Sequence, residues 1–280
     1  MSITKPESSN PILKVARDHA APTPGIQVVG GRATATMAGV VNKTAILLSL
    51  AMLAGGLAYV VVPATTSVVL LSCLTSAVVG LGIAWLLAKN PSAAEHLAPI
   101  YAAVEGAFLG VFTKVLDGVL LSQGATAPGT AAIGGSSLAL PALLITFSCA
   151  AAMLLLYRTG LLRPSQTFKA VLGTLTLGIM MAYLANLVLE VLFGMHLPFL
   201  SIRSAFEGGT PALIGLGLNV LILVVASLWL VVDLEQVEEI VNSGSPVELE
   251  WYGAFALLVT LAWIYFEAVK LALRVAVARE

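Results

Sequence analysis

Long uninterrupted stretches of apolar residues dominate the chain after a comparatively polar start. Each stretch has about the 20 residues that an α-helix needs to cross the hydrocarbon core of a bilayer. The breaks carry turn residues, such as Pro63 and Lys89 to Pro91. The apolar runs cover residues 44–63, 65–88, 97–122, 131–157, 169–194, 211–233 and 251–273. This pattern predicts an all-α integral membrane protein with seven transmembrane helices.

The pattern divides the chain into two parts. Residues 1–43 are rich in polar residues and proline and lack the short apolar core of a signal peptide, so we expect a polar cytoplasmic tail. Residues 44–280 form the predicted seven-helix transmembrane domain. The tight break at Pro63 predicts a hairpin between the first two spans, and Pro141, inside the fourth run, predicts a kink.

The distribution of lysine and arginine predicts the orientation, because positively charged loops tend to stay in the cytoplasm. These residues gather in the tail and in the loops that lie on its side of the membrane, which favours a cytoplasmic N-terminus and, with seven spans, an external C-terminus. The basic end of the last run would then face outward. Six spans with a re-entrant last segment is the alternative topology.

Composition narrows the class of protein further. With 59% hydrophobic and only 10% charged residues, the chain lies far from the average of soluble domains. A net charge of −1 without a basic run argues against nucleic acid as a partner. No His-Glu-x-x-His zinc helix and no Gly-x-Ser-x-Gly elbow is present, so we expect neither an enzyme nor a cofactor.

Charged residues inside the apolar runs are the candidates for function, because each is costly to place in a membrane. Glu105, Asp233 and Glu267 stand out among them. Glu267 and Lys270 are three residues apart, which places them on one helix face where they can pair. The same spacing predicts a pair between Lys114 and Asp117.

The depth of the three carboxylates follows from the 1.5 Å rise per helical residue. Glu105 and Asp233 are expected at a similar level, and Glu267 roughly 10 Å further along its helix. Carboxylates that converge in a low-dielectric site cannot all be charged, so they share protons or bind a hard cation such as Ca²⁺. We therefore expect Asp233 and Glu267, with Glu105 as a third member, to sense protons, and Asp233 and Glu267 to hold Ca²⁺. The alternative is that they pair with polar groups and only hold the bundle together.

An acidic segment follows Asp233 directly and contains Glu235, Glu238 and Glu239. Such a run is typically a solvated helix face. Beside an acidic intramembrane residue, it is also a candidate pore mouth that attracts cations.

Small residues recur within the runs. Examples are the glycines Gly55, Gly56, Gly80, Gly82, Gly106, Gly110, Gly173, Gly178, Gly215 and Gly217. In lipid, small residues allow the backbones of two helices to approach closely. We expect these glycines to mark helix contacts.

Several motifs resemble the Bax-inhibitor-like family of membrane proteins, in particular its bacterial branch with an extended polar N-terminus. They run in order along nearly the whole chain. The segments are Ser9-Asn-Pro-Ile12, Tyr101-Ala-Ala-Val-Glu-Gly-Ala-Phe-Leu-Gly110, Leu155-Leu-Tyr-Arg-Thr-Gly160, Leu230-Val-Val-Asp-Leu-Glu-Gln-Val-Glu238 and Trp263-Ile-Tyr-Phe-Glu-Ala-Val-Lys-Leu271.

The resemblance implies a seven-helix fold with the last helix at the centre, in the inner membrane of a bacterium. It implies a pH-sensitive leak channel for Ca²⁺, governed by one acidic residue late in the sixth helix and one in the seventh. Asp233 matches the first, and Glu267 stands where the family has an aspartate. The partners would then be the lipid bilayer, Ca²⁺ and protons. A non-conducting regulator that binds a membrane protease or another bilayer protein is the alternative function.

Overall fold

A computed structural model describes residues 28–29, 32–63, 65–124, 137–195, 197 and 199–278. Most of the expected polar tail, residues 1–27, lies outside this part of the chain. The long helices are α2 (Met37–Val61), α3 (Thr66–Lys89), α4 (Ala94–Ser122), α5 (Ala139–Arg158), α6 (Gln166–Phe193), α8 (Gly209–Asn242) and α9 (Leu249–Val277). The short elements are the antiparallel pair β1 (Val28–Val29) and β2 (Arg32–Ala33), the 3₁₀ turn η1 (Pro91–Ala93) and α7 (Ser204–Glu207).

Six of the long helices are long and apolar enough to cross a membrane, which confirms an integral membrane protein of the all-α class. They are α2, α3, α5, α6, α8 and α9. The remaining long helix, α4, has 29 residues but carries Glu95, Glu105, Lys114 and Asp117. In α8 the four acidic residues all lie after Val232, whereas in α4 the charged residues are spread along the helix.

The helix boundaries differ from the apolar runs at two places. The helix expected from residue 44 begins at Met37, because the side chain of Thr36 accepts a hydrogen bond from the backbone N–H of Gly39 and caps the first turn. The helix expected from residue 131 begins at Ala139, which places Pro141 in its first turn. The predicted kink at Pro141 is therefore wrong, since proline in a first turn removes no helical hydrogen bond.

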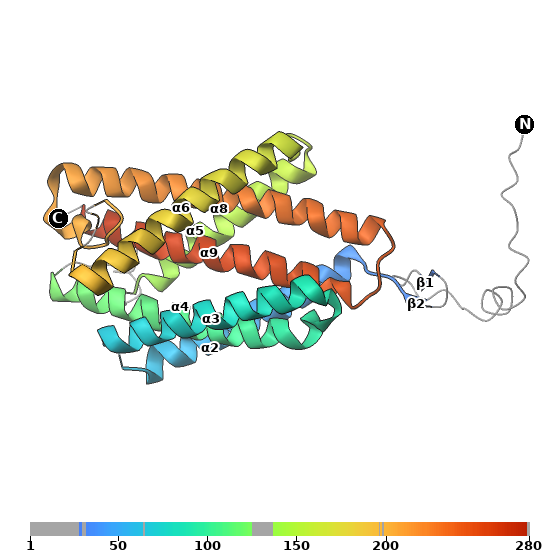
Figure 1. The fold of residues 1–280 in the computed structure, drawn as a ribbon, viewed down its shortest axis with the longest axis horizontal. Coiled ribbons are helices and arrows are strands. Elements are labelled where there is room, and N and C mark those ends of the chain that lie inside the picture. Colours follow the sequence, from blue (N-terminus) through green and yellow to red (C-terminus); the bar gives the residue numbers. More distant parts are fainter. Residues whose placement is uncertain are drawn as a thin grey trace, which may run out of the picture.

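Helix α9 packs against α2, α4, α5 and α8. In Figure 1 it runs between α8 on one side and α2, α3 and α4 on the other. It is the most extensively buried of the six apolar helices, whereas the apolar part of α6 has no buried residue. Most charged side chains that the structure buries lie on α9 or against it.

The tight turn after Val61 joins α2 to α3, but α2 packs mainly along α4. Glycines explain this choice of partner. A Cβ atom on Gly106 or Gly110 of α4 would overlap the backbone of Ala51 or Gly55 of α2, and one on Gly55 would lie 2.8 Å from the Gly106 carbonyl oxygen. The expected role in close helix packing is thus confirmed for these three glycines. It is wrong for five others, where an added Cβ atom would meet nothing within 4 Å: Gly56, Gly82, Gly173, Gly178 and Gly217.

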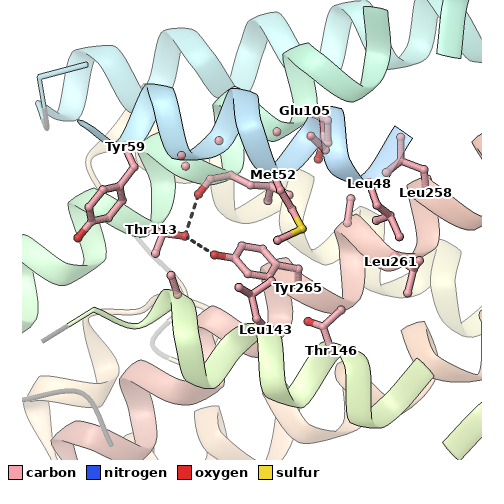
Figure 2. Close-up of a pocket in the computed structure, with 18 of the residues that line it drawn as sticks. Leu48, Met52, Tyr59, Glu105, Thr113, Leu143, Thr146, Leu258, Leu261 and Tyr265 are labelled. Carbon is pink, nitrogen blue, oxygen red and sulfur yellow. Dashed lines mark hydrogen bonds between the residues drawn. The ribbon is translucent and has the colours of Figure 1, made fainter. Parts of the chain in front are cut away.

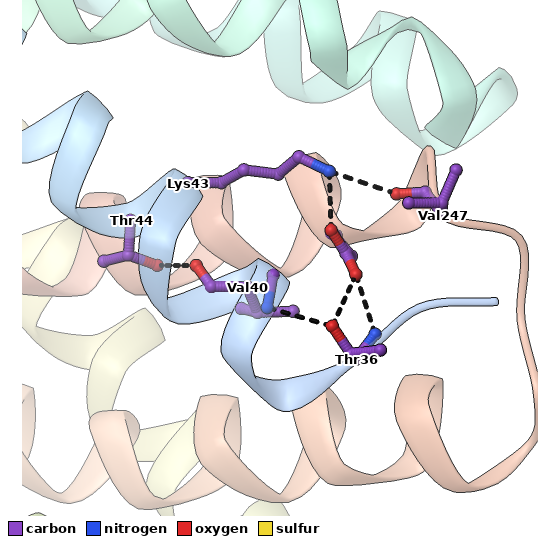
Figure 3. A network of polar contacts seen from close by, with 7 residues as sticks. Thr36, Val40, Lys43, Thr44 and Val247 are labelled. Atoms are coloured by element: carbon purple, nitrogen blue, oxygen red, sulfur yellow. Dashed lines mark hydrogen bonds and ion pairs between the residues drawn. The ribbon is translucent and has the colours of Figure 1, made fainter. Parts of the chain in front are cut away.

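A polar cluster fastens the start of α2 to the start of α9 (Figure 3). The carboxylate of Glu250 accepts hydrogen bonds from the backbone N–H of Thr36 at 2.7 Å and from its hydroxyl at 3.0 Å. Lys43 lies 2.6 Å from the other carboxylate oxygen and also donates to the carbonyl of Val247. The segment before α2 continues this contact, since Thr34 bridges to Pro246 in the α8–α9 turn.

Candidate functional site

Asp233 lies at the interface between α8 and α9, where it is only 9% exposed. The hydroxyl of Thr260 on α9 donates a hydrogen bond to its carboxylate. Within the described part of the chain, no lysine, arginine or histidine pairs with Asp233. A buried carboxylate with one hydroxyl partner is poorly compensated when it is charged.

Glu267 has a different environment, a polar cluster between α6, α8 and α9. Its side chain is fully buried, and the ammonium group of Lys270 lies 2.8 Å from it. Tyr183 of α6 donates at 3.1 Å and the amide of Asn219 in α8 at 2.7 Å. Lys270 also donates to the hydroxyl of Tyr183 at 2.6 Å. The predicted pairing of Glu267 with Lys270 is confirmed, so Glu267 has a cationic partner as well as two neutral donors.

The structure does not bring Asp233 and Glu267 together. Thr260, which binds Asp233, precedes Glu267 by seven residues on α9, or about 10 Å of helix. The two carboxylates share no hydrogen-bond partner. Among the described residues, no group of three or more His, Cys, Asp or Glu side chains is placed to hold a metal ion. The Ca²⁺ site expected at Asp233 and Glu267 is therefore not assembled in this conformation.

Glu105 lies on α4 and accepts a hydrogen bond from Ser76 of α3. Two aromatic contacts between α4 and α9, one before Glu105 and one after it, show its level along α9. Tyr101, one turn earlier, packs on Phe255 with ring centroids 5.1 Å apart, and Phe108 packs on Phe266 at 6.1 Å. Glu105 thus lies near the level of Thr260, so it shares a depth with Asp233, as the helical rise predicted.

The acidic segment after Asp233 forms the end of α8. Glu235 pairs with Lys169 at 2.5 Å, and Glu238 accepts a hydrogen bond from Tyr157. Glu239 is exposed. Two of the three residues expected at a cation-attracting mouth therefore bind the α5–α6 region.

Lys114 and Asp117 do not pair, so the interaction expected from their spacing is wrong. Lys114 donates to the carbonyls of Val60 and Val62 at the end of α2, at 3.3 and 2.8 Å. Asp117 accepts a hydrogen bond from the backbone N–H of Leu138, at the start of α5, at 2.7 Å. A cation at the end of one helix and an anion at the start of another complement the helix dipoles.

A cavity of about 410 Å³ lies between α2, α4, α5 and α9 (Figure 2). Side chains such as Met52 and Leu143 make its walls largely apolar. In Figure 2, Glu105 and Tyr59 lie toward different ends of it, with α2 and α5 on facing sides. Thr113 and Tyr265 are joined within it by a 3.1 Å hydrogen bond. Its volume is in the range of small-molecule sites.

Four of the residues that bind Glu105, Asp233 and Glu267 did not stand out in the sequence: Ser76, Tyr183, Asn219 and Thr260. Asn219 could have been found, because an amide within an apolar run usually needs a partner on another helix. Serine and threonine give no such signal, since their hydroxyls also bond the carbonyl one turn earlier in their own helix.

The fold and the site define a polytopic helical membrane protein that holds three carboxylates, Glu105, Asp233 and Glu267, at separate places in its bundle. The model of a known family, described as Bax inhibitor 1 like, matches residues 7–276. The chain therefore belongs to the Bax inhibitor 1 like family. No curated protein and no solved structure matched it.

Proposed function

We propose that this protein is a pH-sensitive leak channel for Ca²⁺, gated by protonation of carboxylates. The observation that carries the proposal is the environment of Asp233, a buried acid at a helix interface that has a hydroxyl partner and no cationic partner in the described part of the chain. Membership of the Bax inhibitor 1 like family supports an ion leak in general. The proposal requires neither a catalytic residue nor a cofactor, since Ca²⁺ is the transported ion.

The gate would work through the strength of one hydrogen bond. Charged Asp233 accepts a charge-assisted hydrogen bond from Thr260, which holds α8 against α9. Protonation leaves a neutral hydrogen bond, which is weaker by about 1 kcal/mol. A difference of that size shifts the ratio of open to closed channels by roughly fivefold.

Glu267 and Glu105 have secondary roles in this proposal. Lys270 compensates Glu267, so protonation of that carboxylate would leave a buried ammonium group without its partner. Glu267 therefore acts as a second sensor that is coupled to Lys270. Glu105 lies at the depth of Asp233 on another side of α9 and is the third candidate.

The finer topology belongs to the same proposal. We take α4 as a seventh span and α9 as the central helix, which its contacts with four other long helices support. The N-terminus would lie in the cytoplasm of a bacterium and the bundle in its inner membrane. Glu239, with Glu235 and Glu238, would then face the cytoplasmic end of the pathway.

The test is Ca²⁺ flux into proteoliposomes, measured from neutral to acid pH. Asp233→Asn keeps the shape and an acceptor for Thr260 but is always neutral. We expect it to conduct at neutral pH as the wild type does at acid pH, with no further response to acid. Thr260→Val should also raise the flux at neutral pH. Glu190→Gln changes an exposed acid on α6 and is the matched control.

Three results would overturn parts of the proposal. A pH response of Asp233→Asn equal to that of the wild type would remove Asp233 as the sensor, and the same comparison with Glu267→Gln tests the second acid. If the wild type shows no Ca²⁺ flux at any pH, the proposal that the protein is a channel is wrong. A membrane protein that copurifies with the non-conducting chain would then favour a regulator of a membrane protease or another bilayer protein.

A further inference from the structure

The cavity between α2, α4, α5 and α9 is lined by polar groups of which the proposed channel uses only Glu105. Its walls are mainly leucine, alanine, glycine, methionine and phenylalanine. Six lining residues carry polar side-chain oxygens: Tyr59, Glu105, Thr113, Ser137, Thr146 and Tyr265. The position of each hydroxyl proton determines what a ligand in the cavity can bind.

The hydroxyl groups of Thr113 and Tyr265 both donate their protons to hydrogen bonds within the protein. Thr113 donates to the carbonyl of Leu109 at 2.8 Å, so in its contact with Tyr265 the tyrosine must be the donor. A hydroxyl has one proton and two lone pairs. Thr113 and Tyr265 therefore have only acceptor capacity left.

The other three hydroxyls follow the same rule. Tyr59 and Ser137 both donate to the carboxylate of Asp117, at 2.7 and 3.0 Å. Thr146 donates to the carbonyl of Ala142 at 2.8 Å. None of the five hydroxyls that line the cavity has a proton free for a ligand.

Glu105 adds a carboxylate to this set of acceptors. Within the described part of the chain, only Ser76 donates to it, and no cationic side chain pairs with it. A carboxylate in apolar surroundings is stabilised by a cation that brings its own donors. An ammonium group has three donors and no acceptor.

We propose that this cavity is a binding site for an amphipathic organic amine, with the ammonium group on Glu105 and the apolar body between Met52, Leu143 and Tyr265. A ligand whose polar group is a carboxylate or a phosphate does not fit, because every polar group on the wall is an acceptor. The inference rests on the cavity and not on ion conduction, so it holds for a channel and for a regulator.

Gly56 offers a way to test the space independently of the charge. It lines the cavity, and a Cβ atom added to it would meet nothing within 4 Å. Gly56→Leu should therefore fill part of the cavity without disturbing the packing of α2. Gly82→Leu is the matched control, since Gly82 of α3 is equally open but does not line the cavity.

The experiment uses the full chain in phosphatidylcholine nanodiscs and three ligands with one apolar body: adamantan-1-amine, adamantan-1-ol and adamantane-1-carboxylate. Equilibrium dialysis measures binding, and empty nanodiscs give the background from lipid. We expect the amine to bind most tightly and the carboxylate to show only the background. Glu105→Gln should weaken amine binding by about tenfold. Gly56→Leu should weaken it too, whereas Gly82→Leu and Glu190→Gln should not.

The proposal is overturned if the alcohol or the carboxylate binds as tightly as the amine, because the cavity would then be an apolar site without selection for charge. It is also overturned if the amine binds no better than to empty nanodiscs. If Glu105→Gln fails to fold, the comparison of the three ligands on the wild type and on Gly56→Leu still decides the question. If the amine binds but the protein conducts no Ca²⁺, the binding site is supported and only the proposed channel function is wrong.

Discussion

Replacing Gly110 of α4 with alanine tests whether close approach of α2 and α4 stabilises the bundle. The added methyl group would overlap the backbone of Gly55, which cannot rotate away as a side chain could. Gly118 lies eight residues later on the same helix, and a Cβ atom there would meet nothing within 4 Å. Gly118→Ala is therefore the matched control for the effect of alanine on the helix itself.

The magnitude follows from two opposing contributions. Overpacking at a fixed contact costs about 1–3 kcal/mol, because the two helices must move apart and lose contacts along their length. Alanine favours a helix over glycine by up to about 1 kcal/mol. The overlap with backbone places Gly110→Ala at the upper end of the overpacking range. We expect it to lower the free energy of unfolding by about 2 kcal/mol, and Gly118→Ala to leave it unchanged or raise it slightly.

The assay is reversible unfolding in mixed micelles with an increasing fraction of a denaturing detergent, followed by circular dichroism. Both variants and the wild type are compared under the same conditions, so the reference state in the micelle is shared. The reasoning is refuted if Gly110→Ala is as stable as Gly118→Ala, because the α2–α4 contact would then tolerate a wider separation.

Three further predictions concern buried charges. Lys270→Met should lower the free energy of unfolding by about 3–5 kcal/mol, because Glu267 loses the ammonium group that pairs with it, and adding Glu267→Gln should recover most of the loss in the same detergent titration. Asp117→Asn should lower it by about 1–2 kcal/mol, read from thermal unfolding, because a charged acceptor at the start of α5 becomes neutral. Glu250→Gln should speed amide hydrogen exchange in the first turn of α2, since Lys43 loses its ion pair; unchanged exchange would contradict this role.

The long helices could be predicted from the sequence because one signal dominates it. Apolar runs of spanning length have few alternatives to a helix in a bilayer. The start of α2 was missed because Thr36, its N-cap, lies in a polar stretch where threonine is unremarkable. The arrangement of α2 beside α4 also lay beyond the apolar pattern, since it depends on which glycines face each other across two helices.

The ion pairs show the limit of reasoning from spacing on one helix. Glu267 and Lys270 lie three residues apart and pair. Lys114 and Asp117 have the same spacing and do not, because the end of α2 and the start of α5 offer each of them better partners. The spacing of two charged residues shows whether they can pair within one helix. It does not show which groups on neighbouring helices compete for either of them.

Glu105, Asp233 and Glu267 therefore differ less in their depth along the bundle than in the groups that compensate their charge. Asp233 and Glu105 share a level near Thr260, and each is held by one hydroxyl. Glu267 lies further along α9, where Lys270 and two neutral donors surround it. A change of protonation at a compensated acid leaves an opposite charge unpaired in the bundle, whereas the same change at a lone acid removes the unpaired charge. For this reason, binding a proton or a cation costs the fold least at Asp233 and Glu105, because no opposite charge is left unpaired there.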